Sequence, residues 1–179
     1  MNHEYRLTVF VNQKEETMEK AWRSLRLKNK HNVFELMMED TYFRITPFQN
    51  QPRSSLNGYR IAFNGTLEGC MYLLDTSFGW TTVEVTGVYC IIKDEGKSKK
   101  DWLDLLTHDL DGELVDARGL IRVNKKMVSI LPEGVCIEMH APKGKQLNTY
   151  QTLEEIDSIR EMITPKEYDL FSFMEEEAL

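Results

Sequence analysis

Alternating apolar and polar positions predict a strand at the start of the chain, and a helical period follows it. Residues 4–11 alternate and are rich in β-branched and aromatic side chains, which is typical of a strand with one buried face. Beyond residue 12 the apolar side chains recur at the three- and four-residue spacing of an amphipathic helix: Met18, Ala21, Trp22 and Leu25. We therefore expect a first strand over 4–11 and an N-terminal amphipathic helix over 14–27.

The middle of the chain is predicted to be mostly strand. Short segments rich in β-branched and aromatic residues are separated by turn residues such as Asn64-Gly65. The expected strands are a hairpin over 33–48 that turns at Glu39-Asp40, then 59–63, 80–92, 119–123, 127–131 and 135–140. Gly87 suggests a bulge in the longest of them. The region 66–76 fits either a strand or a short helix. The segment 47–58, with two prolines, is expected to be a long exposed loop.

Capping residues predict further helices. Ser98 is expected to cap a short helix that places Trp102, Leu105 and Leu106 on one face. Near the end, Thr152 with Glu155 and Thr164 with Glu167 have the spacing of capping boxes, which predicts two C-terminal helices over 152–163 and 165–177. The expected fold class is α+β, with a largely antiparallel sheet.

Length and composition are those of one globular domain, which we expect to span 1–179. The charged fraction of 28% and the hydrophobic fraction of 41% favour a folded chain over a disordered one. No apolar run approaches the roughly 18 residues that cross a membrane, and no secretory signal is evident. Three separated cysteines, Cys70, Cys90 and Cys136, predict buried free thiols in a cytoplasmic protein and provide no pair for a zinc site.

The net charge of the whole chain lies in its last thirty residues. Nine acids and two bases occur from residue 150 to 179, whereas residues 1–149 hold twenty of each. Apolar and aromatic side chains are interleaved with these acids, so we expect an acidic helical segment over 150–179 that enters a partner's groove. Its predicted partner-binding residues are Tyr168, Leu170, Phe171, Phe173, Glu175, Glu176 and Glu177. Residues 167–171 are also similar to the short Gln-Leu-x-Leu-Phe peptides that bind bacterial sliding clamps.

One string resembles a catalytic motif. Residues 108–116 read His-Asp-Leu-Asp-Gly-Glu-Leu-Val-Asp, and they resemble the Asp-x-Asp-Gly-Thr-Leu-Val signature of haloacid-dehalogenase-like phosphatases. The resemblance implies that Asp109 is a nucleophile and Asp111 a general acid, with Mg²⁺ offsetting phosphate charge. Glu113 stands where the family has a phosphate-binding Thr, and the preceding residues are helical in pattern rather than strand-like. These differences favour a structural acidic turn, while the alternating carboxylates still offer a candidate cation site.

A basic segment and four histidines are the remaining candidates for chemistry. Bases concentrate between Lys20 and His31, around Trp22, but the neutral body and the preceding acids favour a solvated helix face, so nucleic acid is not an expected partner. The histidines lack metal-ligand spacing, and no phosphate-binding loop or nucleophile elbow occurs.

We interpret the chain as a non-catalytic cytoplasmic binding protein, a regulator or inhibitor, whose acidic C-terminal helices bind a protein with a basic or hydrophobic groove. Its size and lack of catalytic motifs are typical of small regulators, including those encoded by phages or other mobile elements. Two alternatives stay open. One is a small metal-dependent enzyme using the acids from Asp109 to Asp116, and the other is a structural subunit of a larger assembly. No catalytic residue, metal ligand, cofactor or membrane segment is assigned.

Overall fold

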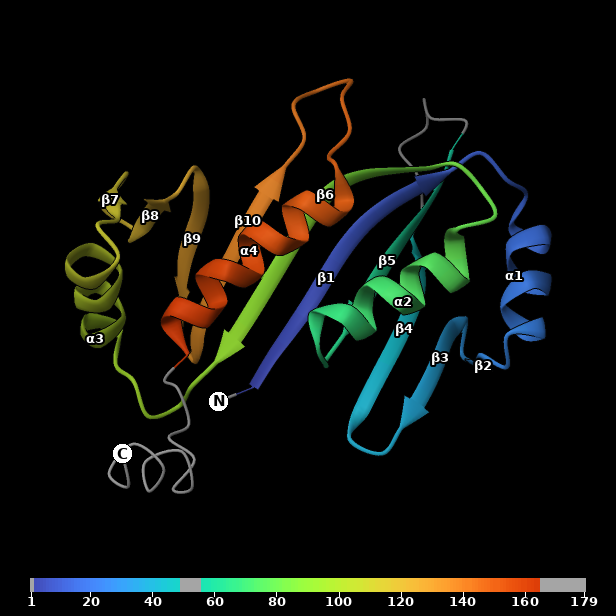
Figure 1. Ribbon diagram of the computed structural model, residues 1–179, viewed down its shortest axis with the longest axis horizontal. Helices are drawn as coiled ribbons and strands as arrows, with labels where there is room; N and C mark the ends of the chain where they lie inside the picture. The colour runs from blue at the N-terminus through green and yellow to red at the C-terminus, as the bar shows by residue number, and fades with distance from the viewer. Residues whose placement is uncertain (1, 49–55, 165–179) are drawn as a thin grey trace, which may run out of the picture.

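The computed structural model describes residues 2–48 and 56–164, which form one ten-stranded antiparallel sheet and four helices (Figure 1). The strands are β1 (Asn2–Val11), β2 (Lys28–Lys30), β3 (Val33–Met38), β4 (Thr41–Phe48), β5 (Asn57–Phe63), β6 (Val83–Lys93), β7 (Glu113–Leu114), β8 (Leu120–Val123), β9 (Lys126–Leu131) and β10 (Gly134–His140). The helices are α1 (Glu15–Ser24), α2 (Leu67–Phe78), α3 (Lys99–Asp104), which continues into the π-helical segment η1 (Leu105–Asp109), and α4 (Thr149–Ile163). The predicted α+β class with a largely antiparallel sheet is confirmed.

The chain consists of two halves with the same topology. The first runs β1-α1-β2-β3-β4-β5-α2, and the second runs β6-α3-β7-β8-β9-β10-α4. The order across the sheet is β2-β3-β4-β5-β1-β6-β10-β9-β8-β7, which is symmetric about the central pair. Because β1 and β6 pair antiparallel, an approximate two-fold axis passes between them and relates the halves. The sequence patterns did not predict this duplication.

All four helices lie on one side of the sheet, which we call the helix side (Figure 1). Strand alternation directs alternate side chains of β1 to this side, and those at 5, 7, 9 and 11 are buried beneath the helices. Trp22 of α1 is the centre of one cluster, with ring centroids 5.1 Å from Phe34, 5.0 Å from Tyr59 and 5.7 Å from Phe78. Burial of these large rings fixes α1 and α2 on the first half of the sheet.

Most of the predicted strands and turns are present. The first hairpin turns at Glu39-Asp40 as expected, and Asn124-Lys125 joins β8 to β9 with both residues at positive φ, 48° and 64°. Positive φ at both central positions is what a two-residue hairpin turn of type I′ requires. The expected bulge near Gly87 also occurs, because Thr8 and Val9 of β1 pair with Gly87 and Val85 and leave Thr86 unpaired.

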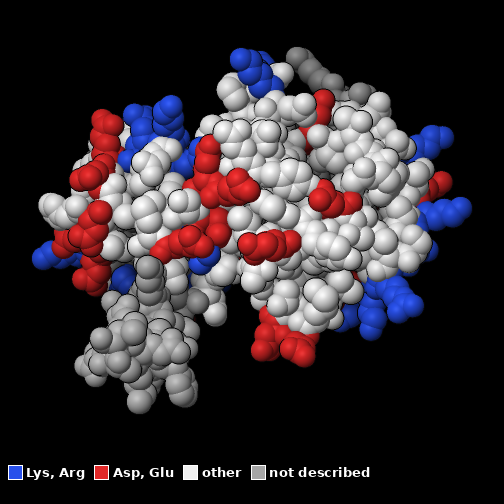
Figure 2. Space-filling model, in the orientation of Figure 1, with Lys and Arg blue, Asp and Glu red and all other residues white. Residues whose placement is uncertain are grey.

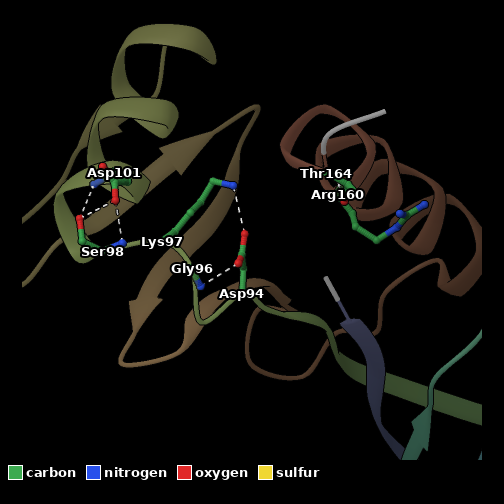
Figure 3. Close-up of polar contacts among 7 residues, drawn as sticks. All are labelled: Asp94, Gly96, Lys97, Ser98, Asp101, Arg160 and Thr164. Atoms are coloured by element: carbon green, nitrogen blue, oxygen red, sulfur yellow. Dashed lines mark hydrogen bonds and ion pairs between the residues drawn. The ribbon is translucent and has the colours of Figure 1, made fainter. Parts of the chain in front are cut away.

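The helix boundaries correct several expectations. The ambiguous region 66–76 is helix α2, whose N-cap Thr66 accepts a hydrogen bond from the Gly69 amide at 3.1 Å. Helix α1 ends at Ser24 rather than at 27, since Arg26 takes a positive φ of 66° that stops a right-handed helix. Ser98 caps α3 as predicted, in a reciprocal capping box with Asp101 (Figure 3).

The predicted capping box at Thr152 and Glu155 is wrong. Helix α4 begins three residues earlier, at Thr149, and its N-cap is Asn148, whose side chain accepts a hydrogen bond from the Gln151 amide at 3.1 Å. Thr152 is instead buried within the helix, and Glu155 pairs with Lys126 of β9. Thr164 ends α4, where its amide and hydroxyl both donate to the Arg160 carbonyl at 2.8 Å (Figure 3). The second predicted C-terminal helix, 165–177, lies outside the described residues.

Among residues 2–48 and 56–164, no helix is long and apolar enough to cross a membrane.

Candidate functional site: the open face of the sheet

The side of the sheet opposite the helices is not covered by any element of the described chain, and we call it the open face. The strand registers place on it the side chains that alternate with the buried ones. These residues include Glu4, Arg6, Thr8, Phe10, Lys28, Lys30, Val33, Glu35, Met37, Tyr42, Arg44, Thr46, Phe48, Arg60, Glu84, Tyr89, Ile91, Lys93, Glu113, Leu120, Arg122, Met127, Ser129, Leu131, Cys136, Glu138 and His140. An uncovered face this rich in aromatic, Met and Arg side chains is a candidate interaction surface.

Aromatic rings and arginines contact one another on the first half of the open face. Phe10 of β1 and Phe48 of β4 meet edge to face, with centroids 5.5 Å apart. The Arg60 guanidinium lies 5.1 Å from the Phe48 ring centroid, and that of Arg44 lies 4.3 Å from the Tyr42 centroid. Stacking of the guanidinium groups on the aromatic rings orders these side chains and leaves them accessible to a partner.

Two glutamates pair with three of the cations on this half of the open face, Arg6, Lys30 and Arg44. Glu35 pairs with Lys30 and with Arg44, each at 3.2 Å, and the hydrogen bond from Lys30 is the main cause that lowers the pKa of Glu35. Glu4 accepts hydrogen bonds from the Tyr42 hydroxyl and from Arg6. Arg60 has no carboxylate partner among the described residues, so its charge is the one near the centre of this half that is left for a ligand.

The second half has a different centre. Tyr89 of β6 and His140 of β10 pack edge to face at 5.2 Å, and the Tyr89 hydroxyl lies 3.4 Å from His140 Nδ1. His140 Nε2 lies 3.6 Å from Glu138, and burial raises the pKa of Tyr89. Apolar side chains on the same half of the face are Ile91 of β6 and Met127 and Leu131 of β9.

The fold separates charges that are balanced along the sequence. The first half of the open face carries five bases (Arg6, Lys28, Lys30, Arg44, Arg60) and two acids (Glu4, Glu35), whereas the second half carries two bases (Lys93, Arg122) and three acids (Glu84, Glu113, Glu138). On the helix side, α2 and α4 together hold six acids and one base. Figure 2 shows these acids across the middle of the helix side, with Lys and Arg towards its margins.

The structure does not assemble the acids from Asp109 to Asp116 into a centre. Asp109 ends η1, Glu113 pairs with Arg122 across β7 and β8 at 3.7 Å, and Asp116 accepts hydrogen bonds from the Arg118 and Leu120 amides. These amides lower the pKa of Asp116. Within the described ranges, no three His, Cys, Asp or Glu side chains lie close enough to hold a metal ion. Asp109 is the last residue of a helical segment, whereas the phosphatase resemblance implies that it follows a strand.

The loop before α3 is likewise organised by its own hydrogen bonds. Asp94 accepts from the Gly96 amide at 3.0 Å and from Lys97 Nζ at 3.1 Å, as Figure 3 shows. The Lys97 hydrogen bond is the main cause of the lowered pKa of Asp94. These contacts stabilise the turn from β6 into α3.

Three polar side chains beneath α4, those of Tyr5, Asp157 and Arg160, form a hydrogen-bonded cluster that stabilises the fold. The Tyr5 hydroxyl donates to Asp157 of α4, and Arg160 donates to the same carboxylate oxygen at 2.6 Å. Asp157 is buried, and Arg160 is nearly so. The three side chains attach α4 to the central strand, where a buried carboxylate is tolerated because both partners are present.

The cysteines are free thiols. Cys70 and Cys90 are buried, and burial raises the pKa of Cys70 to about 12. Cys136 differs from the expectation of three buried cysteines, since it is half-buried on the open face, where burial raises its pKa to about 11. A protonated thiol of this kind is a poor nucleophile.

The binding residues that we predict from the sequence belong to the tail: Tyr168, Leu170, Phe171, Phe173, Glu175, Glu176 and Glu177. All of them lie outside the described residues. The basic segment 20–31 forms the end of α1 and strand β2, so it contributes Lys28 and Lys30 to the open face. The open face itself was missed. The available signal was the run Tyr42-Arg44-Thr46-Phe48, which alternates with the buried positions of β4 and is not simply polar.

Comparison of the sequence with protein-family models and with curated proteins finds no match.

Proposed function

We propose that this protein is a non-catalytic binding protein that holds a protein partner on the open face of its sheet. The observation that carries the proposal is the contrast between the two sides: every described helix lies on one, and the other presents aromatic, Met and Arg side chains to solvent. Arg and Tyr, together with Trp, are the side chains that most often dominate the binding energy of protein interfaces.

The charge pattern of the open face supports a protein partner. Most of its acids are paired with its bases, as in Glu35 with Arg44 and Glu113 with Arg122, so the face is close to neutral. Protein interfaces combine such a mixed polar surface with aromatic anchors, whereas nucleic-acid affinity requires cations that are free to contact phosphates. A regulatory or inhibitory role, with the acidic segment 165–179 as a second contact, stays a prediction.

A second candidate function rests on one observation. The first half of the open face has five bases against two acids, interleaved with the rings of Phe10, Tyr42 and Phe48. Aromatic rings that stack on bases, beside cations that contact the backbone, are how open sheets bind single-stranded nucleic acid. Residues 1–149 are neutral as a whole, which favours no nucleic-acid partner, but this half of the open face has an excess of bases.

The experiment is capture from native host extract by the immobilised full-length protein, compared with two variants of equal charge change. Arg60→Glu alters the open face, whereas Lys143→Glu alters an exposed loop beyond β10. The proposal expects a captured protein that Arg60→Glu reduces at least about tenfold and Lys143→Glu does not, because Arg60 is central to the interface. Nuclease-sensitive, salt-sensitive capture lost by Arg60→Glu would favour the second candidate. Equal capture by both variants would contradict both.

A further inference from the structure

A groove of about 900 Å³ lies on the helix side, away from the open face. It is bounded by the start of α2, the C-terminal end of α4 and the β3–β4 hairpin. Helix α1 covers Phe34 near the start of β3, but no described helix covers the far end of this strand. Leu36 and Met38, which point to the helix side, are therefore left to form part of the groove.

The floor and one wall of the groove are apolar. Leu36, Met38, Phe63 and Leu73 contribute to it, and Tyr72 stands beside them with 69% of its surface exposed. Met38 is 44% exposed. Large apolar side chains that remain exposed next to a concave surface mark a site for another molecule, and methionine adapts its shape to different apolar partners.

The rim of the groove is acidic. Four carboxylates line it, Glu39, Glu68, Asp157 and Glu161, against the single base Arg160. Arg160 pairs with Asp157 at 2.6 Å and with Glu161 at 3.8 Å, so one base faces two of these carboxylates. His3 also lines the groove, and burial together with Arg160 lowers its pKa, so it adds no positive charge at neutral pH. Glu39 and Glu68 are exposed and have no ion-pair partner among the described residues, which leaves a negative field above an apolar floor.

We propose that this groove binds a short basic amphipathic segment of a partner protein, with apolar side chains on the floor and Lys or Arg at the rim. Charge complementarity selects this occupant, because nucleic acid and the acidic segment 165–179 have the same sign as the rim. Helices with an apolar stripe and a charged face dock into grooves of this kind. The groove goes beyond the proposed function, since it is a second site on the opposite side of the sheet and would let the protein join two partners.

The test uses two labelled peptides of about 14 residues, close to four helical turns. The first has Leu at the i, i+3, i+4, i+7 positions and Lys elsewhere, and the second has Ser in place of each Leu. Fluorescence anisotropy with the full-length protein measures binding at about 50 mM and about 200 mM salt. We expect saturable binding of the Leu peptide, weakened by salt, and at least about tenfold weaker binding of the Ser peptide, which has the same charge but buries no apolar surface.

Matched variants locate the binding site. Glu39→Gln with Glu68→Gln should weaken binding of the Leu peptide at least about fivefold, because two rim charges are lost. Glu95→Gln with Glu133→Gln removes the same charge from exposed residues outside the groove and should change the affinity less than about twofold. Tyr72→Ser removes an exposed wall residue and should weaken binding without unfolding the protein, which circular dichroism checks.

Three results would overturn the assignment. Equal weakening by both pairs of glutamate variants would mean attraction to net charge rather than to the groove. Equal affinity for the Leu and Ser peptides would mean that the apolar floor is not used. Self-association that Glu39→Gln with Glu68→Gln abolishes, with no peptide bound by the monomer, would assign the groove to a second copy of the chain. None of these results depends on Arg60, so they leave the open-face proposal separately testable.

Discussion

The Tyr5 hydroxyl on the central strand β1 donates a hydrogen bond to the Asp157 carboxylate on α4, although 152 positions separate the two residues. Arg160 donates to the same carboxylate and is only 16% exposed. Asp157→Ala should therefore lower the free energy of unfolding by about 3 kcal/mol, because the buried Tyr5 hydroxyl loses its acceptor and the largely buried Arg160 guanidinium keeps only the exposed Glu161 carboxylate, at 3.8 Å. Urea denaturation measures the change, with Glu154→Ala on the exposed side of α4 as the control. A loss no larger than that of the control would show that this group does not hold α4 in place.

Asn148 should account for the start of α4. Because its side chain accepts from the Gln151 amide, Asn148→Ala should lower the free energy of unfolding by about 1 kcal/mol. Asn148→Asp should preserve most of the stability, since a carboxylate also caps a helix. Thermal denaturation of both variants distinguishes them. Equal destabilisation by the two would argue against a capping role.

The ion pair between Glu155 and Lys126 should make part of the stability depend on acidic pH. The hydrogen bond that Lys126 donates to the Glu155 carboxylate lowers the pKa of Glu155 below the ordinary value of 4.5. A group with a lowered folded pKa stabilises the fold above its unfolded pKa, and this contribution is lost as pH falls through the folded value. The stability difference between the wild type and Glu155→Gln should therefore be constant from about pH 6 to 8 and shrink below about pH 4.5. A difference that persists undiminished to about pH 2 would contradict the pairing.

Tyr59 should contribute to alkaline unfolding. Its hydroxyl is buried without a hydrogen-bond partner among the described residues, and burial raises its pKa from 10.0 to about 12. The neutral phenol is favoured in the fold, so the stabilising contribution is complete below pH 10 and is lost as pH rises through about 12. Between pH 10 and about 12 the free energy of unfolding of Tyr59→Phe should fall less than that of the wild type. At neutral pH the two free energies should differ by less than about 1 kcal/mol. Tyr72→Phe, at an exposed ring, should behave as the wild type does.

Strand alternation made the sheet predictable from the sequence, because the buried and exposed positions of β1 and β10 differ clearly in side-chain type. Helix α2 was ambiguous, because Met71, Tyr72, Leu73 and Leu74 are four consecutive apolar residues, which spread apolar character around much of its circumference and left a weak helical period. The cap of α4 was misplaced because Thr152 has the right spacing to Glu155. Its buried position in the helix comes from packing, which no local pattern reveals.

The candidate surface was harder to predict. Which side of a sheet the helices cover follows from the connections between strands, and the two-fold order of the strands is a property of pairing rather than of spacing. The charges of Arg60 and Glu68 cancel when the charges are summed along the sequence. They separate only when the fold places them on opposite sides of the sheet.

Photo-crosslinking to a partner tests the central claim most directly. A benzophenone amino acid is placed at Thr46 on the open face, or at Glu154 on the helix side outside the groove, and each full-length protein is irradiated in native host extract. The proposal predicts a discrete protein adduct from position 46 that Arg60→Glu abolishes, and no such adduct from position 154. Adducts of the same proteins in the same yield from both positions, unaffected by Arg60→Glu, would contradict the assignment of the open face as the binding surface.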